Sequence, residues 1–399
     1  MFATPHRFGS SPMTGRANLA SLPTELKIKI ALALAEGAKG GLARHRAFSS
    51  LTLVNHAWQE VCEPIAHEDS VIDTSTTDGD GAILLPPQRL RRFLRSVHFE
   101  LRSRGPLAPL VKGLLAPSER IETLGVMLDD DYRDLADLVN TLDQLRPFVR
   151  SVHKLDLLFY RWHTPNELRA ATRLLQACSD LRDLYLDISP PEKRASSDSL
   201  EAYEIFNRTV FALSTLRKVE IWRTTLDIGS SLQLDWPQLR QIKIIWNAFW
   251  DTSSSDAGRA LHLFLLSLPR SLVSICVDWS YDCRIRPHFA AEDHIASPSK
   301  ITFPRLAYFI QRGLDGDALC LIDSATPIRC IEYGDFSNKD FLATGKFRLA
   351  QPIKTVAEVA YETSRLSPEE EMAFRAWADR YGIKITCNTP DDGDEGMSI

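Results

Sequence analysis

The sequence predicts an α/β protein in two parts: a short helical segment at the N-terminus, then an open, irregular solenoid of parallel strands with helices on its convex side. A short apolar signature that recurs along most of the chain predicts the strands. Segments with helical periodicity between its copies predict the helices. A pair of amphipathic helices between Leu22 and Ile65 predicts the separate N-terminal part, because two such helices need further partners to bury their apolar faces.

The signature is an aliphatic residue, any two residues, a second aliphatic residue, any one residue, and a third apolar residue. Its last three positions alternate, so each copy predicts a short strand with one buried face. The copies are Ile121/Leu124/Val126, Val152/Leu155/Leu157, Leu181/Leu184/Leu186, Leu216/Val219/Ile221, Leu239/Ile242/Ile244, Leu272/Ile275/Val277, Phe303/Leu306/Tyr308 and Ile328/Ile331/Tyr333. Three copies share an arginine after the first aliphatic residue: Arg182, Arg217 and Arg240.

A longer match links two of the repeats. Residues 92–98 (RFLRSVH) return as residues 147–153 (PFVRSVH), an offset of 55 residues from Arg95 to Arg150. The match places His98 and His153 at equivalent positions. A general base is needed once per site, so a duplicated histidine favours a structural or surface role.

Capping patterns predict where the intervening helices begin. Residues 164–167 (TPNE) form a capping box with proline in the first turn and predict a helix over 168–178. Residues 367–370 (SPEE) repeat this pattern and predict a helix that ends near Gly382, before a final strand over 383–387. Further amphipathic segments lie at 134–145, 200–213 and 258–268.

Strand and helix together, at roughly 23 to 35 residues per unit, resemble a leucine-rich-repeat solenoid from Leu90 to Cys387. The asparagine or cysteine that this family carries after the strand is mostly missing, so an irregular curved array is expected. A doubly wound α/β fold is the competing prediction. Its strands read as continuous apolar runs, however, and no glycine-rich phosphate turn follows any strand here.

The N-terminal segment carries two helical patterns. In the first, Pro23 suits the first turn, and Ser21 can cap it. One face of this helix carries Leu26, Ile30, Ala33 and Leu34. The second helix repeats the pattern with Leu51, Val54, Trp58, Val61 and Ile65, and has Pro64 near its end.

This segment resembles the F-box. The opening residues 22–25 (LPTE), the aliphatic residues Leu26, Ile30 and Leu34, and the closing run Leu51, Val54 and Trp58 carry the resemblance. Ala31 and the long loop over 36–50 depart from the family pattern. The resemblance implies docking on a Skp-type adaptor, and through it on a cullin scaffold. The residues that it assigns to the adaptor contact are Leu22, Pro23, Leu26, Ile30, Leu53, Val54 and Trp58.

Composition narrows the class of protein. The chain has 399 residues, of which 44% are hydrophobic and 25% charged, as in soluble globular proteins. Its net charge of −5 provides no overall basic field for nucleic acid or an anionic membrane. No apolar run reaches the ~18 residues that span a bilayer. Seven scattered cysteines indicate reduced thiols, and therefore a cytoplasmic or nuclear protein.

These patterns divide the chain into four segments. Residues 1–18 are expected to be a disordered tail, 19–75 the F-box-like domain, 76–388 the repeat domain, and 389–399 an acidic disordered tail. A mitochondrial transit peptide is the alternative for the first segment, which lacks the amphipathic period of such peptides.

The sequence predicts no catalytic residue, metal or cofactor. It contains no phosphate-binding glycine motif, no His-Glu-x-x-His and no Gly-x-Ser-x-Gly. Residues 129–131 (DDD) could hold a divalent cation, but such a run is more simply a helix start. Cys276, Cys283, His288 and His294 lie within one stretch, at spacings wider than those of most structural zinc sites.

The functional surface is therefore expected on the face of the sheet that carries the residues between the buried aliphatics. Tyr160, Tyr185 and Trp222, together with Lys243 and Asp278, form the predicted contact with a protein substrate, because aromatic residues anchor interfaces and charges select partners. An ordinary solvated sheet face is the alternative. With the F-box resemblance, this implies a substrate receptor of an SCF-type ubiquitin ligase. A repeat protein whose N-terminal helices only cap the solenoid, and an enzyme, are the other hypotheses.

Overall fold

The computed structural model describes residues 19, 22–37, 48, 51, 54–75, 83, 85–102, 107–118, 120–129, 132, 134–159, 164–188, 196–224, 234–246, 254–278, 300–312, 318–333, 355–362 and 368–388. These residues divide into two compact units: unit 1 extends to Asp69, and unit 2 begins at Ser70. The sequence pattern places this border at residue 76. The predicted tails, 1–18 and 389–399, lie outside the described residues.

Unit 1 is built on two helices that pack against each other, α1 (Thr24–Gly37) and α3 (His56–Ala66). Helix α3 begins at His56, a turn later than the apolar pattern suggests. The cause is Asn55, whose backbone is extended and whose side chain accepts a hydrogen bond of 3.0 Å from the Trp58 N–H. Asparagine is a favoured N-cap, because it satisfies an N–H group that has no partner within the helix.

Helix α1 packs inside unit 1 through a face of two alanines and one lysine. Lys27, Ala31 and Ala35 are its buried positions, and they recur at every fourth residue. The alanines leave room for the bulky indole of Trp58, and the ammonium group of Lys27 lies 5.9 Å from the centroid of that ring. The face with Leu26 and Leu34 is therefore not the one that packs inside the unit, and both side chains are exposed.

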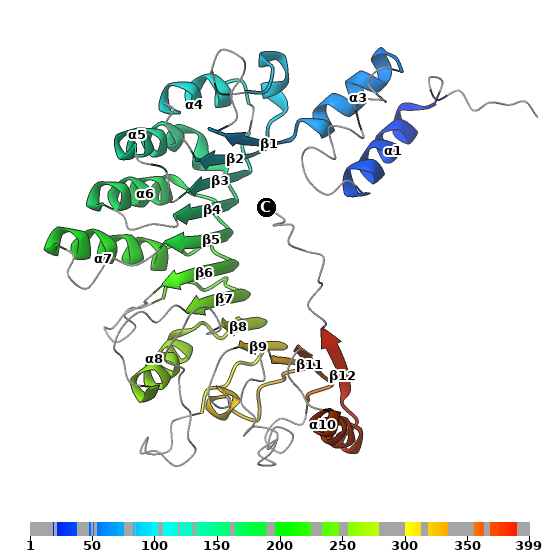
Figure 1. Ribbon diagram of the computed structural model, residues 1–399, viewed down its shortest axis with the longest axis vertical. Helices are drawn as coiled ribbons and strands as arrows, with labels where there is room; N and C mark the ends of the chain where they lie inside the picture. The colour runs from blue at the N-terminus through cyan, green and yellow to red at the C-terminus, as the bar shows by residue number, and fades with distance from the viewer. Residues whose placement is uncertain are drawn as a thin grey trace, which may run out of the picture. The chain divides into compact units, whose positions relative to one another are not determined.

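The main feature of unit 2 is a sheet of twelve strands whose order in the sheet is their order in the chain (Figure 1). Every described pairing from β2 to β12 is parallel. The strands are β1 (Asp69–Asp73), β2 (Ser96–Leu101), β3 (Thr123–Leu128), β4 (Lys154–Phe159), β5 (Asp183–Ile188), β6 (Lys218–Thr224), β7 (Gln241–Trp246), β8 (Ser274–Asp278), β9 (Tyr308–Arg312), β10 (Cys330–Tyr333), β11 (Glu358–Glu362) and β12 (Lys384–Asn388). The predicted fold class is confirmed.

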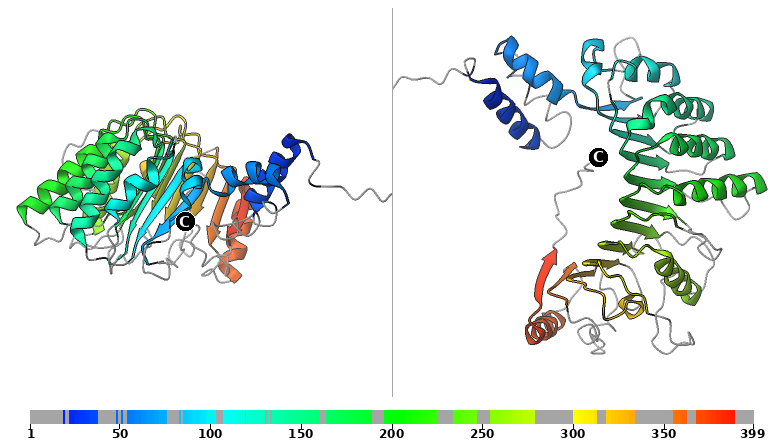
Figure 2. Two further views of the ribbon diagram at one scale, coloured as in Figure 1. Left: turned by 90° about the horizontal axis from the view of Figure 1, so that it is seen from above. Right: turned by 180° about the vertical axis from the view of Figure 1, so that it is seen from behind.

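Helices or 3-10 turns lie between most successive strands, and the helices lie on one side of the sheet. The helices are α4 (Ala108–Leu115), α5 (Leu135–Leu145), α6 (Pro165–Ala177), α7 (Ser197–Phe211), α8 (Ser254–Ser267) and α10 (Pro368–Tyr381), with 3-10 turns η2 (Gln88–Phe93), η3 (Arg146–Ser151) and η4 (Ala318–Leu321). Figures 1 and 2 show α4 to α8 stacked outside the curve of the strands, so that the opposite face of the sheet lines the inside of the curve. Unit 2 is thus an open solenoid in which repeats contact their neighbours.

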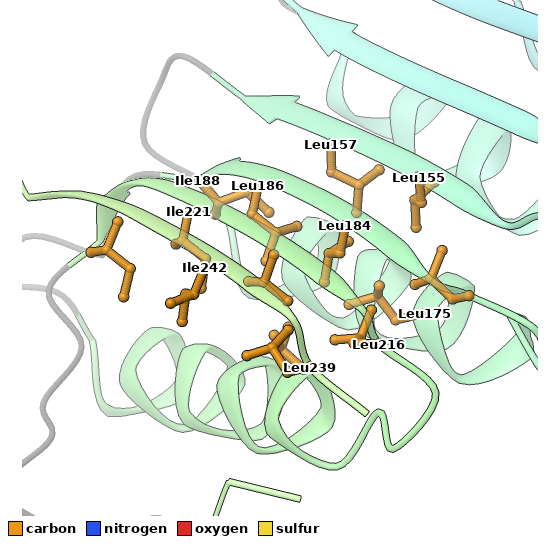
Figure 3. Close-up of a cluster of buried hydrophobic side chains, with 14 of the residues drawn as sticks. Leu155, Leu157, Leu175, Leu184, Leu186, Ile188, Leu216, Ile221, Leu239 and Ile242 are labelled. Carbon is orange, nitrogen blue, oxygen red and sulfur yellow. The ribbon is translucent and has the colours of Figure 1, made fainter. Parts of the chain in front are cut away.

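The core of unit 2 is a continuous stack of aliphatic and aromatic side chains between sheet and helices. Figure 3 shows its central part, where residues of β4 to β7 meet α6. The second aliphatic position of each copy forms one row across the sheet: Val97, Leu124, Leu155, Leu184, Val219, Ile242, Ile275, Phe309, Ile331, Val359 and Ile385. Each fully buried side chain of this size contributes roughly 1.5 to 3 kcal/mol. Repeat length varies from 22 residues (Tyr308 to Cys330) to 35 (Asp183 to Lys218).

Two predicted alignments are wrong by three residues. In β9, Phe309 pairs with Ile275 and Ile331, so the true copy begins at Leu306, and Tyr308 is 51% exposed rather than buried. In β4, the register puts Asp156 opposite Gly125 and Gly125 opposite His98. His153 therefore precedes the strand and is not equivalent to His98. The first two aliphatic positions of the signature are three residues apart. An alignment that is shifted by three residues therefore still matches an apolar residue with an apolar residue.

Three elements were not predicted. Strand β11 carries a copy of the signature, Val356/Val359/Tyr361, that its Glu358 and Ala357 neighbours obscure. Strand β1 has too few apolar positions to show a period. Helix α4 has buried residues at helical spacing, Ala108, Val111, Leu114 and Leu115, but it is only eight residues long and its N-cap residue provides no side-chain hydrogen bond to its start. By contrast, the predicted end of α10 is confirmed: Gly382 adopts φ 67°, and the Ile383 N–H bonds the Ala378 carbonyl at 2.9 Å, the pattern of a glycine-terminated helix.

A ladder of hydroxyl groups joins adjacent repeats. In four repeats the residue directly before the first aliphatic position donates to the carbonyl of the equivalent aliphatic residue one repeat earlier. The bonds are Ser151 Oγ to Ile121 O (2.8 Å), Thr215 Oγ1 to Leu181 O (2.6 Å), Ser271 Oγ to Leu239 O (2.8 Å) and Thr355 Oγ1 to Ile328 O (2.7 Å). These bonds join neighbouring repeats just before each strand begins, whereas the asparagine ladder of leucine-rich repeats lies after the strand.

Replacing Thr215 with valine should lower the free energy of unfolding of unit 2 by about 1 kcal/mol, because the Leu181 carbonyl loses a partner while the side-chain shape is kept. Thr209→Val is the matched control: its hydroxyl bonds within α7 at an exposed position, and its loss should cost less than about 0.5 kcal/mol. Urea unfolding followed by circular dichroism measures both. An equal loss of unfolding free energy in the two variants would contradict the inference that Thr215 joins neighbouring repeats.

Candidate functional site

The open face of the sheet carries a cluster of two aromatic and two charged side chains, which we call the sheet-face cluster: Tyr185, Glu220, Trp222 and Lys243. Parallel pairing in register brings Tyr185 of β5, Glu220 of β6 and Lys243 of β7 into one row. Trp222 follows two residues after Glu220 and therefore projects from the same face. All four side chains are partly exposed.

The four side chains hold one another in place. The rings of Tyr185 and Trp222 lie 6.0 Å apart between centroids at 58°, a tilted aromatic pair. The indole N–H of Trp222 donates to the Glu220 carboxylate at 2.8 Å, and Lys243 Nζ lies 2.8 Å from the same carboxylate. Lys243 Nζ also lies 5.0 Å from the Trp222 ring centroid. Because the aromatic rings are fixed before any partner arrives, binding would cost little side-chain entropy.

Asp278, another predicted contact, lies beside the cluster but is nearly inaccessible. It is 5% exposed, and Arg312 Nη1 lies 4.0 Å from its carboxylate. Arg312 also forms an ion pair with Glu332. We therefore assign Asp278 to positioning Arg312 rather than to direct contact with a partner.

Cys276 lies between Lys243 and Ile310 in the row of the cluster. Burial raises the pKa of this thiol to about 12, which outweighs the opposite influence of the Lys243 charge. The thiol is therefore protonated at neutral pH and is a poor nucleophile.

A second polar group faces the same side near β3. Asp156 is buried, with Oδ2 at 3.2 Å from Lys154 Nζ, and its Oδ1 has no hydrogen-bond partner among the described residues. The neighbouring position in β3 is Gly125, and a Cβ atom there would lie 2.1 Å from His98 Nδ1. A side chain at Gly125 would displace the imidazole, so glycine at this position allows His98 to lie across β3.

Unit 1 presents an apolar surface, which we call the helical-pair surface. Its exposed members among the described residues are Leu19, Leu26, Ile28, Leu32, Leu34 and Val54. Leu26 is 46% exposed and Val54 is 40% exposed. Large apolar side chains are exposed on both flanks of the buried face of α1, which is unusual for a solvated helix and is typical of an interaction site.

The predicted adaptor contacts fall into four groups. Pro23, Leu26 and Val54 are exposed, and Leu22 and Ile30 are half-buried. Trp58 is completely buried and packs inside unit 1, so it supports the helical-pair surface from beneath. Leu53, like the predicted substrate contact Tyr160, lies outside the described residues. Glu220 was not among the predicted contacts; its place beside Lys243 follows only from the register.

No group of histidine, cysteine, aspartate or glutamate side chains that could hold a metal ion occurs in the part of the chain that the structure describes. Two of the three aspartates at 129–131, and three of the four residues at 276–294 considered for zinc, lie outside that part. No helix within the described ranges is long and apolar enough to cross a lipid bilayer.

Comparison of the sequence with models of protein families finds no match, and comparison with curated proteins finds none either. What the chain does must therefore be inferred from its own residues and their arrangement.

Proposed function

We propose that this protein is the substrate-recognition subunit of an SCF-type ubiquitin ligase, in which unit 1 binds a Skp-type adaptor and the open sheet face of unit 2 binds a protein client. The observation that carries the proposal is the helical-pair surface. Leu26 and Val54, which the F-box resemblance assigns to the adaptor, are exposed while Trp58 of the same motif is buried. Large apolar side chains on the surface of a small helical unit are typical of a site that binds a partner protein.

The client half of the proposal is supported by the sheet-face cluster. Trp222 and Tyr185 are aromatic residues in a fixed, partly exposed pair, with Glu220 and Lys243 beside them. Aromatic anchors with a charged surround are typical of protein interfaces. In this proposal the chain catalyses no bond-breaking step. It raises the local concentration of client lysines near the ligase.

The test is binding of the purified full chain to a purified Skp-type adaptor, measured by isothermal titration calorimetry. We expect Leu26→Asp/Val54→Asp to weaken binding at least about tenfold, because each carboxylate would be buried without a partner. Both side chains are exposed, so the variant should fold like the wild type, and thermal unfolding checks this.

Ile205→Asp/Leu263→Asp is the matched control. Ile205 on α7 and Leu263 on α8 are also exposed apolar residues, but they belong to unit 2. This control should bind the adaptor as the wild type does. Failure of the folded wild-type chain to bind any Skp-type adaptor would sink the proposal and leave the alternative, a repeat protein whose N-terminal helices only cap the solenoid.

A further inference from the structure

Three arginines lie on neighbouring strands at the edge of the sheet where the strands begin. Arg182, Arg217 and Arg240 directly precede β5, β6 and β7, and the first residues of these strands are paired in register. The arginines therefore occupy one position on three neighbouring strands, at the tails of the arrows in Figure 1. Adjacent strands are about 4.8 Å apart, so the row spans about 10 Å.

The backbone of this arginine row is fixed by hydrogen bonds. The Arg182 carbonyl accepts from the N–H groups of Arg217 (2.7 Å) and Lys218 (3.0 Å). The Arg217 carbonyl accepts in the same way from Arg240 (2.8 Å) and Gln241 (3.0 Å). The spacing of the three side chains is therefore set by the sheet, and only the side chains need to be ordered on binding.

The three arginine side chains of the row are exposed, and no carboxylate among the described residues forms an ion pair with them. Among the described residues neither Arg182 nor Arg217 has an ion-pair partner, and Arg240 Nη1 makes a single bond of 3.3 Å to the Ser271 carbonyl. The start of the same edge differs. There Glu122 lies 3.9 Å from Arg95 and 3.5 Å from Arg120, so a carboxylate of the chain itself offsets part of the positive charge.

Neighbouring side chains strengthen the positive charge of the row. Arg150 and Lys218 lie on the same edge, against two acidic side chains, Asp180 and Asp183. An excess of cations is thus concentrated on one edge of a chain whose net charge is −5. Complementary charge of this kind selects a partner of the opposite sign.

We propose that the arginine row binds an acidic segment of a partner protein, an extended run of aspartate and glutamate residues. Arginine pairs with carboxylates through two parallel hydrogen bonds. Successive residues of an extended chain advance by about 3.4 Å, so three or four of them match the row. Asp180 and Asp183 interrupt the positive field and would oppose the denser charge of a nucleic acid. The proposal is independent of the adaptor and of the sheet-face cluster.

The test is the affinity of the full chain for a labelled poly-glutamate peptide, measured by fluorescence anisotropy at low and at physiological salt. The wild type should bind, and more weakly as salt rises. Arg182→Glu/Arg217→Glu/Arg240→Glu should lower the affinity by at least about tenfold. The matched control is Lys112→Glu/Arg375→Glu/Arg380→Glu, which changes the net charge equally at exposed cationic residues of α4 and α10 and should bind nearly as the wild type does.

Three results would overturn the proposal. One is an equal loss in the two triple variants, which would mean that only net charge matters. Another is tighter binding of a single-stranded oligonucleotide, abolished by the same three substitutions. The third is a gain in peptide affinity when residues 389–399 are deleted, which would assign the row to the acidic end of the chain itself. If charge reversal impairs folding, Arg182→Gln/Arg217→Gln/Arg240→Gln gives the same comparison with a smaller expected loss.

Discussion

Replacing Trp58 with alanine is expected to unfold unit 1 while unit 2 keeps its structure. The indole is completely buried, its N–H donates to the Leu19 carbonyl at 2.8 Å, and it packs on Lys27 and on the helix face of Ala31. Removing a buried tryptophan costs about 3 to 5 kcal/mol. The core of a unit of fewer than about 70 to 80 residues rarely supplies more than that, so little folded unit 1 should remain.

Hydrogen exchange resolves the two units separately. In Trp58→Ala the amides of α1 and α3 should exchange without protection, while those of β4 to β8 should exchange as in the wild type. Trp58→Phe is the control: it retains an aromatic ring and loses only the bond to Leu19, so most protection should remain. Full protection of α1 and α3 in Trp58→Ala would show that other contacts hold the unit. Leu26→Asp, on the surface, should leave protection unchanged.

The sequence predicts strand positions well where the signature is complete. In the signature, the second aliphatic residue follows the first by three positions and the third follows the second by two. All three side chains can point into the core only where the chain enters a strand. β5 to β8 accordingly begin at the residue that this spacing indicates. The same spacing fails in β9, because Phe303, Leu306 and Phe309 are all buried and successive ones are three residues apart. Periodicity then allows two registers, and only pairing with β8 and β10 selects one.

The candidate site was predictable in part for the same reason. Alternation along a strand indicates that Tyr185, Trp222 and Lys243 face away from the core, and the structure places them together. It does not indicate that Asp278 is buried, because burial on this face depends on Arg312 of the next strand. Side-chain exposure within a sheet depends on neighbouring strands, and a local pattern does not contain that information.

Contacts between repeats could not be predicted at all. The hydroxyl ladder joins residues about 30 positions apart, and serine and threonine before an apolar residue are too common to signal it. In α1, the burial of Lys27 depends on the position of Trp58, which belongs to the other helix. The same applies to Asp137, which looks like an ordinary acidic residue in the first turn of α5.

Replacing Asp137 with alanine is expected to lower the free energy of unfolding of the first repeats by about 3 to 5 kcal/mol. The buried carboxylate accepts three hydrogen bonds, from the N–H groups of Leu107 (2.9 Å) and Ala108 (3.1 Å) and from the Tyr132 hydroxyl (2.8 Å). The two N–H groups are at the beginning of α4, where the helix dipole favours a negative charge. Each buried donor left without a partner costs about 1 to 3 kcal/mol, and the loss of the charge adds to this.

Because repeats are stabilised mainly by their neighbours, the loss should be local. Amides of α4, β2 and β3 should exchange faster in Asp137→Ala than in the wild type, whereas those of β8 and β9 should not change. Asp137→Asn keeps an acceptor and the shape, so it should lose about half as much. Asp134→Ala removes only the exposed cap of α5 and should cost about 1 kcal/mol. If Asp137→Ala costs no more than Asp134→Ala, the carboxylate does not tie α4 to α5. A cost at Asp137 well above that at Asp134 would instead show that the Asp137 carboxylate, which caps α4 from the next repeat, holds α4 and α5 together.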